Sequence, residues 1–383
     1  MFERKKGGEK ALVVHLRRAR GELENAQEFL ELAKTAGAEV GVELWARSDK
    51  PNPRFFIGTG KVEEIKALVE QENYQVVLIN KSLSSIQERN LEAHLQCRVV
   101  DRTSLILDIF AQRARSHEGK LEVELAQLRH MATRLVRGWS HLERQRGGIG
   151  NRGPGESQLE TDRRLLAKRV QVISERLDAA VKKRDQGRKA RDRSGVAQIA
   201  LVGYTNAGKS TLFNRLTKSQ VHVADQLFAT LDPTVRRIEL PDYGPITVAD
   251  TVGFVQDLPH ELVAAFRSTL TEAREAQLLL HVVDSADPMC AERMRDVDIV
   301  LEEIGANTIP QLLVMNKIDL LGQPAKFEPG ERPRVWISAQ SGLGMAELKA
   351  AIASLLPERV DTARLQDHHQ DSGYNQDESS EPE

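Results

Sequence analysis

The sequence predicts an α/β protein in which two domains of alternating strands and helices flank a helical hairpin. Short apolar runs alternate with segments that carry leucine or isoleucine at helical spacing, first over residues 11–110 and again from residue 196. Between them, two heptad-spaced seams of apolar residues predict long packed helices. Because strands that alternate with helices form mainly parallel sheets, we expect this order: a small α/β domain over residues 1–115, a basic helical hairpin over 116–194, a domain with a doubly wound sheet over 195–357, and a disordered acidic tail over 358–383.

The composition is that of a soluble globular protein, with 40% hydrophobic and 29% charged residues. No run approaches the ~20 apolar residues that span a membrane, and no apolar secretory segment follows the charged N-terminus. Cys97 and Cys290 have no metal-ligand spacing and fit a reducing compartment. We therefore expect a cytoplasmic monomer without stable membrane insertion.

The formal net charge of −2 is unevenly distributed. Residues 113–193 hold 21 Lys and Arg against 11 Asp and Glu, an excess of ten positive charges, whereas the tail is acidic. This pattern favours a polyanionic partner, although many basic helices are merely solvated.

In the first domain, apolar runs predict strands at residues 11–16, 40–45, 75–79 and 98–100. The helical patterns cover residues 22–36, 62–72 and 84–95. The glycine pair at residues 58–61 has two interpretations. It is either a second phosphate loop, for a nucleotide such as ATP, or a helix-entry turn. The absence of Ser or Thr after Lys61 favours the turn.

The hairpin is predicted from two apolar seams with the same heptad-like spacing. They comprise Leu121, Leu125, Leu128, Ala132, Leu135, Trp139 and Leu142, followed by Leu166, Val170, Ile173, Leu177 and Ala180. A glycine-rich tip at residues 147–155 interrupts them and is not expected to be helical. Arg144, Arg146 and Arg152 cluster there as candidate contacts to RNA phosphates, or as part of a solvated turn. Residues 182–193 are expected to be a charged junction.

A strand, a glycine loop and a helix follow one another at residues 197–216, and together they form a cradle for nucleotide phosphates. Glycines let several backbone N–H groups point at one anion, and the helix N-terminus adds partial positive charge. Lys209 is expected to reach the β- and γ-phosphates and to neutralise charge in the transition state, while Ser210 ligates Mg²⁺. The loop comprises Gly203, Tyr204, Thr205, Asn206, Ala207, Gly208, Lys209 and Ser210.

Two further segments are expected to respond to the γ-phosphate. The first comprises Phe228, Ala229, Thr230, Leu231 and Asp232, and the second Asp250, Thr251, Val252 and Gly253. Thr230 is a candidate Mg²⁺ ligand when the loop is ordered, Asp250 a ligand through water, and Gly253 a γ-phosphate contact. Phe254 follows, where many GTPases carry the Gln that orients the attacking water. Slow intrinsic hydrolysis is therefore expected.

Two loops are predicted to select guanine. The first comprises Asn316, Lys317, Ile318 and Asp319, and the second Ser338, Ala339 and Gln340. The Asp319 carboxylate can accept hydrogen bonds from both N1–H and the 2-amino group of guanine, a donor pair that adenine lacks. Asn316 is expected to tie its loop to the phosphate loop.

These motifs, in this order, identify a TRAFAC-type GTPase domain. The combination of GYTNAGKS, FATLDPT, DTVGF, a glycine-rich RGPGE segment and a basic hairpin resembles the HflX family of bacterial ribosome-associated GTPases, in the Obg-like superfamily. The resemblance implies binding of GTP and GDP, docking on the large (50S) ribosomal subunit and its rRNA, and splitting or rescue of stalled ribosomes under stress. In that family the hairpin reaches towards the peptidyl transferase region. Many members carry an extra C-terminal domain, whereas a short acidic tail follows Leu356 here.

Alternatives remain at this stage. A nucleic-acid-remodelling ATPase is disfavoured by Asp319, and a membrane-associated or metabolic GTPase would use the hairpin only for dimerisation. Asn206 either helps bind a K⁺ ion, as in some GTPases with Asn at this position, or merely fits the turn.

Overall fold

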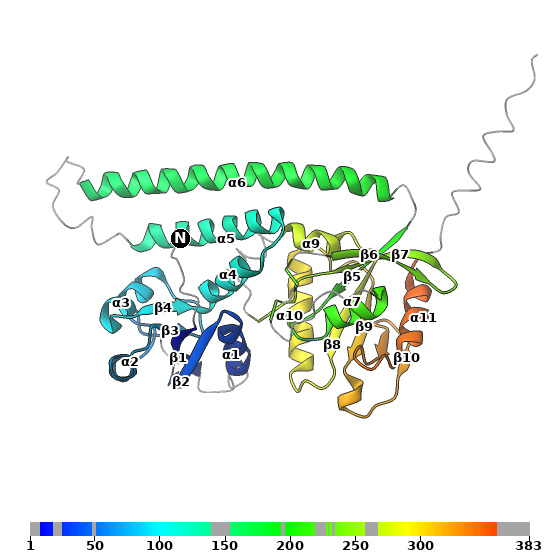
Figure 1. The fold of residues 1–383 in the computed structure, drawn as a ribbon, viewed down its shortest axis with the longest axis horizontal. Coiled ribbons are helices and arrows are strands. Elements are labelled where there is room, and N and C mark those ends of the chain that lie inside the picture. The colour runs from blue at the N-terminus through cyan, green and yellow to red at the C-terminus, as the bar shows by residue number, and fades with distance from the viewer. Residues whose placement is uncertain are drawn as a thin grey trace, which may run out of the picture.

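The computed structural model describes residues 8–17, 25–47, 51–138, 154–192, 196–218, 227–228, 230–231, 234–256 and 267–357. The predicted tip arginines, Ala229, Asp232 and the acidic tail lie outside these ranges. Figure 1 shows two α/β bodies side by side, with one long helix running over both.

The N-terminal domain is a four-stranded parallel sheet with helices on both faces. The strand order is β2 (Ala38–Arg47), β1 (Glu9–Arg17), β3 (Val76–Ile79) and β4 (Arg98–Asp101). Alternate residues along each strand point to opposite faces. One face packs on α1 (Asn25–Thr35) and α4 (Arg102–Arg113), and the other on α2 (Thr59–Glu72) and α3 (Ser85–Leu95). The predicted strands and helices are confirmed.

Two segments of this domain bear on the sequence predictions: helix α4 and the turn at Gly58. Helix α4 was not predicted, because seven of its twelve residues are buried and only Ser104, Asp108 and Gln112 form a short polar stripe at helical spacing. The Gly58 turn begins α2: Gly58 has an ordinary φ of −65°, and Lys61 pairs with Glu64 at 2.7 Å. These contacts support the helix-entry interpretation over a phosphate loop.

The hairpin consists of α5 (His117–Gly138) and α6 (Pro154–Asp192), which pack against each other. Leu121, Leu125 and Ile173 form the buried centre of the seam, flanked by Leu128, Val170 and Leu177. At its edge Arg169 Nε donates to Glu124 Oε1 at 2.8 Å. The central parts of the two predicted seams therefore meet as expected, whereas Trp139 and Leu142 lie outside the described residues.

The bounds of α6 correct two expectations. The helix begins at Pro154, inside the segment predicted to be non-helical, because proline in a first turn lacks an N–H that would be unbonded anyway. It also continues to Asp192, through residues predicted to be a junction. Lys and Arg are good helix formers, so the charged composition did not end the helix.

The C-terminal domain is a seven-stranded mixed sheet. Its order is β10 (Lys326–Glu328), β11 (Arg334–Trp336), β9 (Gln311–Asn316), β8 (Leu278–Asp284), β5 (Ala197–Val202), β7 (Gly244–Asp250) and β6 (Thr234–Leu240). The two outermost pairs are antiparallel and the rest parallel. The helical elements are α7 (Lys209–Thr217), α9 (Arg267–Arg274), α10 (Cys290–Glu303), the 3₁₀ turn Ile318–Leu320 and α11 (Met345–Leu355).

One hydrophobic core continues from the N-terminal domain into the C-terminal domain. It holds Phe29 of α1 and Phe110 of α4 together with Ala200 of β5 and Phe254. Figure 1 shows α1 and α4 on the side of the N-terminal domain that faces the C-terminal domain. The two domains are therefore packed together through apolar side chains, and not only linked by the hairpin.

Candidate nucleotide-binding site

The loop after β5 has the backbone conformation of a phosphate cradle. Gly203 has φ +146°, and a Cβ there would lie 2.3 Å from the Val282 carbonyl oxygen. Gly208 has φ +94°, and a Cβ there would lie 2.3 Å from Asn316 Nδ2. Both positions therefore require glycine, because of backbone conformation and of space. Helix α7 begins at Lys209, so its N-terminus points into the cradle.

Lys209 lies buried beneath this loop. Its Nζ donates to the carbonyl oxygens of Gly203 at 3.0 Å and Tyr204 at 2.7 Å. Burial lowers the pKa of Lys209 to about 8, although the nearby Asp250 carboxylate opposes the shift. A charged ammonium held at low solvation is available to an anion that enters the cradle.

Three oxygen-bearing side chains from three separate segments meet next to Lys209. Ser210 Oγ and Thr230 Oγ1 lie 2.9 Å apart, and each donates to Asp250 Oδ2 at 2.9 Å. Burial raises the pKa of Asp250, while Lys209 and the two hydroxyls lower it. Asp250 Oδ1 is buried and has no hydrogen-bond partner among the described residues. Hydroxyl and carboxylate oxygens are ligands that Mg²⁺ prefers, so the set fits that ion.

The segment after β7 lies directly over the phosphate loop. A Cβ on Gly253 would lie 3.0 Å from Lys209 Nζ, so only glycine lets the backbone come this close. Phe254 pairs its backbone with the loop: Thr205 N donates to Phe254 O at 2.8 Å, and Phe254 N donates to Gly203 O at 3.2 Å. Its side chain is only 1% exposed and belongs to the shared core.

The two base-side loops are joined by one buried side chain. Asn316 Nδ2 donates to Ala207 O at 2.8 Å, and Asn316 Oδ1 accepts from Ala339 N at 2.8 Å. The Lys317 ammonium pairs with Asp284 at 2.6 Å, and Asp319 is exposed. Asn316 thus connects the phosphate loop, its own loop and the Ser338–Gln340 loop.

Arg215, which the sequence patterns did not single out, supports the loop at Ser338–Gln340. Arg215 of α7 donates from Nε to Ala339 O at 3.1 Å and also contacts the Gln340 carbonyl oxygen. Ser338 is fully buried, and its Oγ accepts from Ser341 N at 3.1 Å. An arginine on a helix face gives no local signal that it serves a loop so far along the chain.

The predicted site residues therefore divide into two groups. Lys209, Ser210, Thr230, Asp250 and Gly253 gather at the cradle, with Asn316 beside it. Other members of the motifs have buried side chains and can contact a ligand only through their main chain, part of which is already bonded within the protein, because the Ala207 carbonyl and the Ala339 N–H are bonded to Asn316. The buried members are Tyr204, Ala207, Phe228, Leu231, Val252, Ile318 and Ala339. Thr251 is also buried, and its Oγ1 donates to Leu201 O at 2.6 Å.

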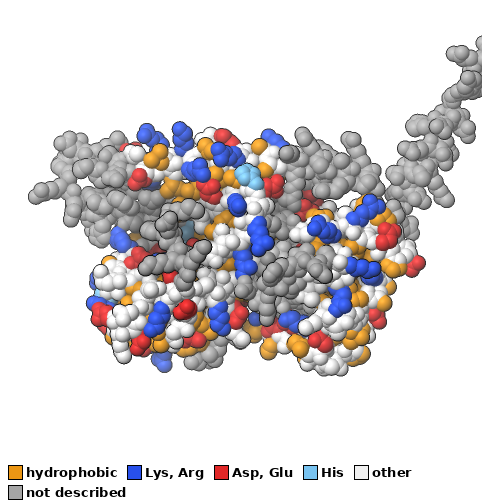
Figure 2. All heavy atoms as spheres, viewed as in Figure 1, with side chains coloured by type: hydrophobic (Ala, Val, Ile, Leu, Met, Phe, Trp, Pro, Cys, Tyr) orange, Lys and Arg blue, Asp and Glu red, His pale blue; other side chains and the backbone are white. Residues whose placement is uncertain are grey.

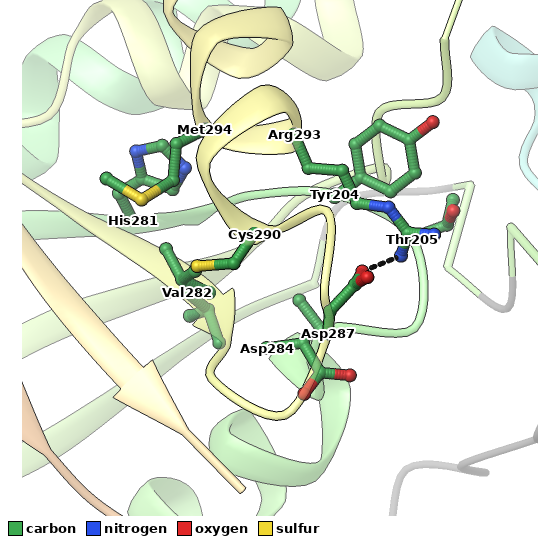
Figure 3. Close-up of a pocket in the computed structure, with 11 residues that line it drawn as sticks. Tyr204, Thr205, His281, Val282, Asp284, Asp287, Cys290, Arg293 and Met294 are labelled. Carbon is green, nitrogen blue, oxygen red and sulfur yellow. Dashed lines mark ion pairs between the residues drawn. The ribbon is translucent and has the colours of Figure 1, made fainter. Parts of the chain in front are cut away.

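A small hollow lies against the other side of the phosphate loop, between the end of β8 and α10 (Figure 3). His281, Cys290 and Met294 line it, together with an ion pair between Arg293 and Asp287. Burial lowers the pKa of His281 to about 4 and raises the pKa of the Cys290 thiol, so both are uncharged near neutral pH. Ser210, Asp250 and Asp319 are absent from its lining, so the hollow is distinct from the cradle.

Within the described ranges, no helix has the length and apolar character needed to cross a membrane. The same part of the chain contains no group of three His, Cys, Asp or Glu side chains arranged to hold a metal. The cradle, with its hydroxyls and single carboxylate, is a different kind of cation site.

Family models match three consecutive parts of the chain. Residues 23–111 match "GTP-binding GTPase N-terminal", residues 113–191 match "GTP-binding GTPase Middle Region", and residues 198–317 match "50S ribosome-binding GTPase". These matches cover the parallel-sheet domain except β1, nearly all of the hairpin, and most of the mixed sheet.

Relatives extend this similarity over nearly the whole chain. The GTPase HflX of Escherichia coli K12 is 55% identical over 94% of this chain and 86% of its own length. The GTPase HflX of Caldanaerobacter subterraneus is 46% identical over 92% and 82%. A solved structure described as an SsGBP and GDP complex has the same fold, with a TM-score of 0.51, 24% identity and coverage of 91% and 98%. With its cradle, its base-side loops and these relatives together, the chain belongs to the HflX family of GTPases, which hydrolyse GTP.

Proposed function

We propose that this GTPase binds GTP across the loops of the cradle, hydrolyses it slowly when alone, and uses the cycle to engage the large ribosomal subunit. The observation that carries the proposal is the convergence of Ser210, Thr230 and Asp250 beside Lys209, from segments 20 and 40 residues apart. Such a set is useful only when an anion and a cation enter together.

Each residue has a role in the proposal. The backbone N–H groups of residues 203–210 and the Lys209 ammonium bind the phosphates. Ser210 and Thr230 would hold Mg²⁺ directly, and Asp250 through a water molecule. When bound, this ion neutralises phosphate charge and orients the γ-phosphate. The Gly253 N–H faces the same phosphate, because the backbone passes so close to Lys209.

In this proposal Asp319 selects guanine, and the Ala339 region would lie on the opposite side of the base. Asp319 is exposed, so its carboxylate is free of the core and can accept from N1–H and the 2-amino group. The Lys317 stem would cover one face of the base while its ammonium remains on Asp284.

Hydrolysis is expected to need outside help. The Phe254 ring is buried in the shared core and has no polar atom to orient water. We propose that the ribosome supplies the missing group or orders the two segments that are expected to respond to the γ-phosphate, which we call switch I (residues 228–232) and switch II (residues 250–256). A high turnover of the purified protein, without stimulation by large subunits, would contradict this.

Asn206 carries a second cation hypothesis. Its φ of +59° fits a tight turn, which the plain structural interpretation also explains. If its side chain helps bind K⁺ in place of an arginine finger, hydrolysis should be faster in K⁺ than in Na⁺. Equal rates in the two salts would leave Asn206 as a turn residue.

The hairpin is the proposed ribosome-binding element. Helix α6 exposes Arg163, Arg164, Lys168, Arg176 and Lys182, whereas Arg169 at its edge pairs with Glu124 of α5. Figure 2 shows Lys and Arg side chains along the edge that this helix forms. Basic side chains on a rigid helix suit the phosphates of rRNA. The match to a model described as "50S ribosome-binding GTPase" supports the same partner.

We propose further that the GTP-bound protein splits or rescues stalled ribosomes under stress, acting as a cytoplasmic monomer. The test is co-sedimentation with ribosomal subunits in GTP, in GDP and without nucleotide, over a range of salt. We expect binding to 50S that is strongest with GTP and falls as salt rises. Binding that ignores nucleotide and salt would refute the proposal.

A variant separates the tip of the hairpin from the nucleotide site. Replacing Arg144, Arg146 and Arg152 by alanine should weaken ribosome binding and flatten its salt dependence by up to ~3 in the log–log slope. GTP affinity should stay unchanged and subunit splitting should be lost. Normal splitting by this variant would make the hairpin a spacer.

A further inference from the structure

Two buried charges of the N-terminal domain reach the nucleotide site. Glu28 of α1 is 8% exposed and Arg102 of α4 is 2% exposed, and they form an ion pair. The second carboxylate oxygen of Glu28 accepts the hydroxyl hydrogen of Tyr204, the second residue of the phosphate loop. Arg102 also donates to Asn80 Oδ1 at 3.0 Å, which fixes the guanidinium within its own domain.

The same two side chains hold the segment that follows Gly253. Gln256 N donates to the Tyr204 hydroxyl at 2.7 Å, and Gln256 O accepts from Arg102 Nη2 at 3.1 Å. Both main-chain polar groups of Gln256 are thus bonded to the set formed by Glu28, Arg102 and Tyr204, which we call the switch II clamp. Tyr204 is held from its other side as well, because Arg293 of α10 stacks on its ring at 4.7 Å (Figure 3).

Apolar contacts attach the other switch segment to the same domain. The Phe228 ring packs edge-on against Phe110 of α4, with ring centroids 4.5 Å apart. Leu227 and Leu231 lie in the same core as Val252, Phe254 and Val255. Both segments that flank the proposed γ-phosphate position therefore rest on helix α4 and its neighbours.

A packing role alone does not account for the switch II clamp. Apolar residues of similar volume would hold two domains together as well as a buried ion pair does, because desolvation offsets most of its attraction. The charged and hydroxyl groups add directional hydrogen bonds, which fix the backbone N–H and C=O of Gln256. Gln256 lies three residues after Gly253, whose backbone passes over Lys209.

We propose that Glu28, Arg102 and Tyr204 are positioning residues for GTP, which hold the Gly253 N–H in place for the γ-phosphate. The N-terminal domain is then part of the machinery that distinguishes a triphosphate from a diphosphate. The inference rests on the proposed γ-phosphate position beside Gly253. It implies that a partner that shifts the N-terminal domain changes the affinity for GTP and leaves that for GDP unchanged.

The test compares the affinities for GDP and for a non-hydrolysable GTP analogue in single variants of the full-length chain. Tyr204→Phe removes one hydroxyl and keeps the ring on Arg293, and Glu28→Gln keeps the shape of the side chain. Each should weaken binding of the analogue about tenfold relative to GDP, because a hydrogen bond to a charged partner is lost. The double variant should lose no more than either single one, since both act through one contact. Single-turnover hydrolysis should slow with them.

The selectivity ratio separates positioning from general destabilisation, which would weaken both nucleotides alike. Glu72→Gln is a matched control, because Glu72 forms an exposed ion pair with Lys10 at 3.2 Å in the same domain. It should leave the ratio unchanged. If Tyr204→Phe and Glu28→Gln fold normally and keep the wild-type ratio, the switch II clamp has no positioning role. Failure of the wild type to bind GDP would instead overturn the proposed phosphate site.

Discussion

Among the side chains at the nucleotide site, Asn316 is the one whose truncation should disturb the site most, although the truncation removes little volume. It is 2% exposed and forms two hydrogen bonds of 2.8 Å, to Ala207 O and from Ala339 N. Asn316→Ala leaves a buried carbonyl and a buried N–H without partners, and each such group costs about 1–3 kcal/mol. Both groups belong to loops that face the nucleotide. We therefore expect GDP affinity to fall at least ~100-fold, or about 2.8 kcal/mol.

The assay is a titration with a fluorescent GDP, accompanied by thermal unfolding without nucleotide. Asn316→Asp is the matched variant. It keeps an oxygen for the Ala339 N–H but replaces the donor by a carboxylate oxygen that faces the Ala207 carbonyl. It should lose affinity to a similar degree, because the bond to the phosphate loop turns repulsive. A dissociation constant for Asn316→Ala within threefold of wild type would refute the role of this residue as a link between loops.

Three further predictions concern the base, the phosphates and the hairpin. Asp319→Asn should lower GTP affinity at least ~100-fold and let XTP bind instead, in competition against fluorescent GDP; unchanged GTP affinity would contradict the guanine assignment. Because the pKa of Lys209 is lowered to about 8, GDP affinity should fall up to about tenfold per pH unit above pH 8. A GDP affinity that stays constant up to pH 9.5 would argue against a charged lysine at the phosphates. Burial raises the pKa of Glu88, on the face of α3 that meets Arg134 of the hairpin, to about 7. The folded state then binds a proton between pH 4.5 and 7 that the unfolded state lacks, so the free energy of unfolding should rise as pH falls through this window, by at most about 3 kcal/mol. Glu88→Gln should remove that dependence in urea unfolding, and an unchanged slope would count against it.

Patterns with a local period predicted most of the fold. The alternation of apolar runs and helical spacing predicted the central parallel strands of both sheets, because burial on both faces of a parallel strand selects continuous apolar residues. The seam of Leu121, Leu125 and Ile173 was predicted for the same reason, since heptad spacing places these side chains on one face. Helix α4 was missed because most of its residues are buried and its polar stripe is short.

The sequence predicted only those parts of the site that lie within contiguous motifs. Loops after β5, β7 and β9 lie at the same edge of the sheet, so their motifs had to converge. The residues that hold these loops come from elsewhere. Arg215 reaches Ala339 over 124 residues, and Glu28 reaches Tyr204 over 176. Contacts at such separations leave no spacing pattern in a single sequence.

The sequence suggests one interpretation of Phe254, and the structure shows a second role for it. In the sequence it stands where a water-orienting Gln is common, and it predicts only a deficit in hydrolysis. In the structure its ring anchors switch II in a core shared with the N-terminal domain, and its backbone is bonded to Thr205 and Gly203. A glutamine at this position would place a polar amide in that core, at a cost of about 1–3 kcal/mol unless it found partners. The core that holds switch II against the second domain therefore disfavours a water-orienting side chain at this position, and we expect activation from outside.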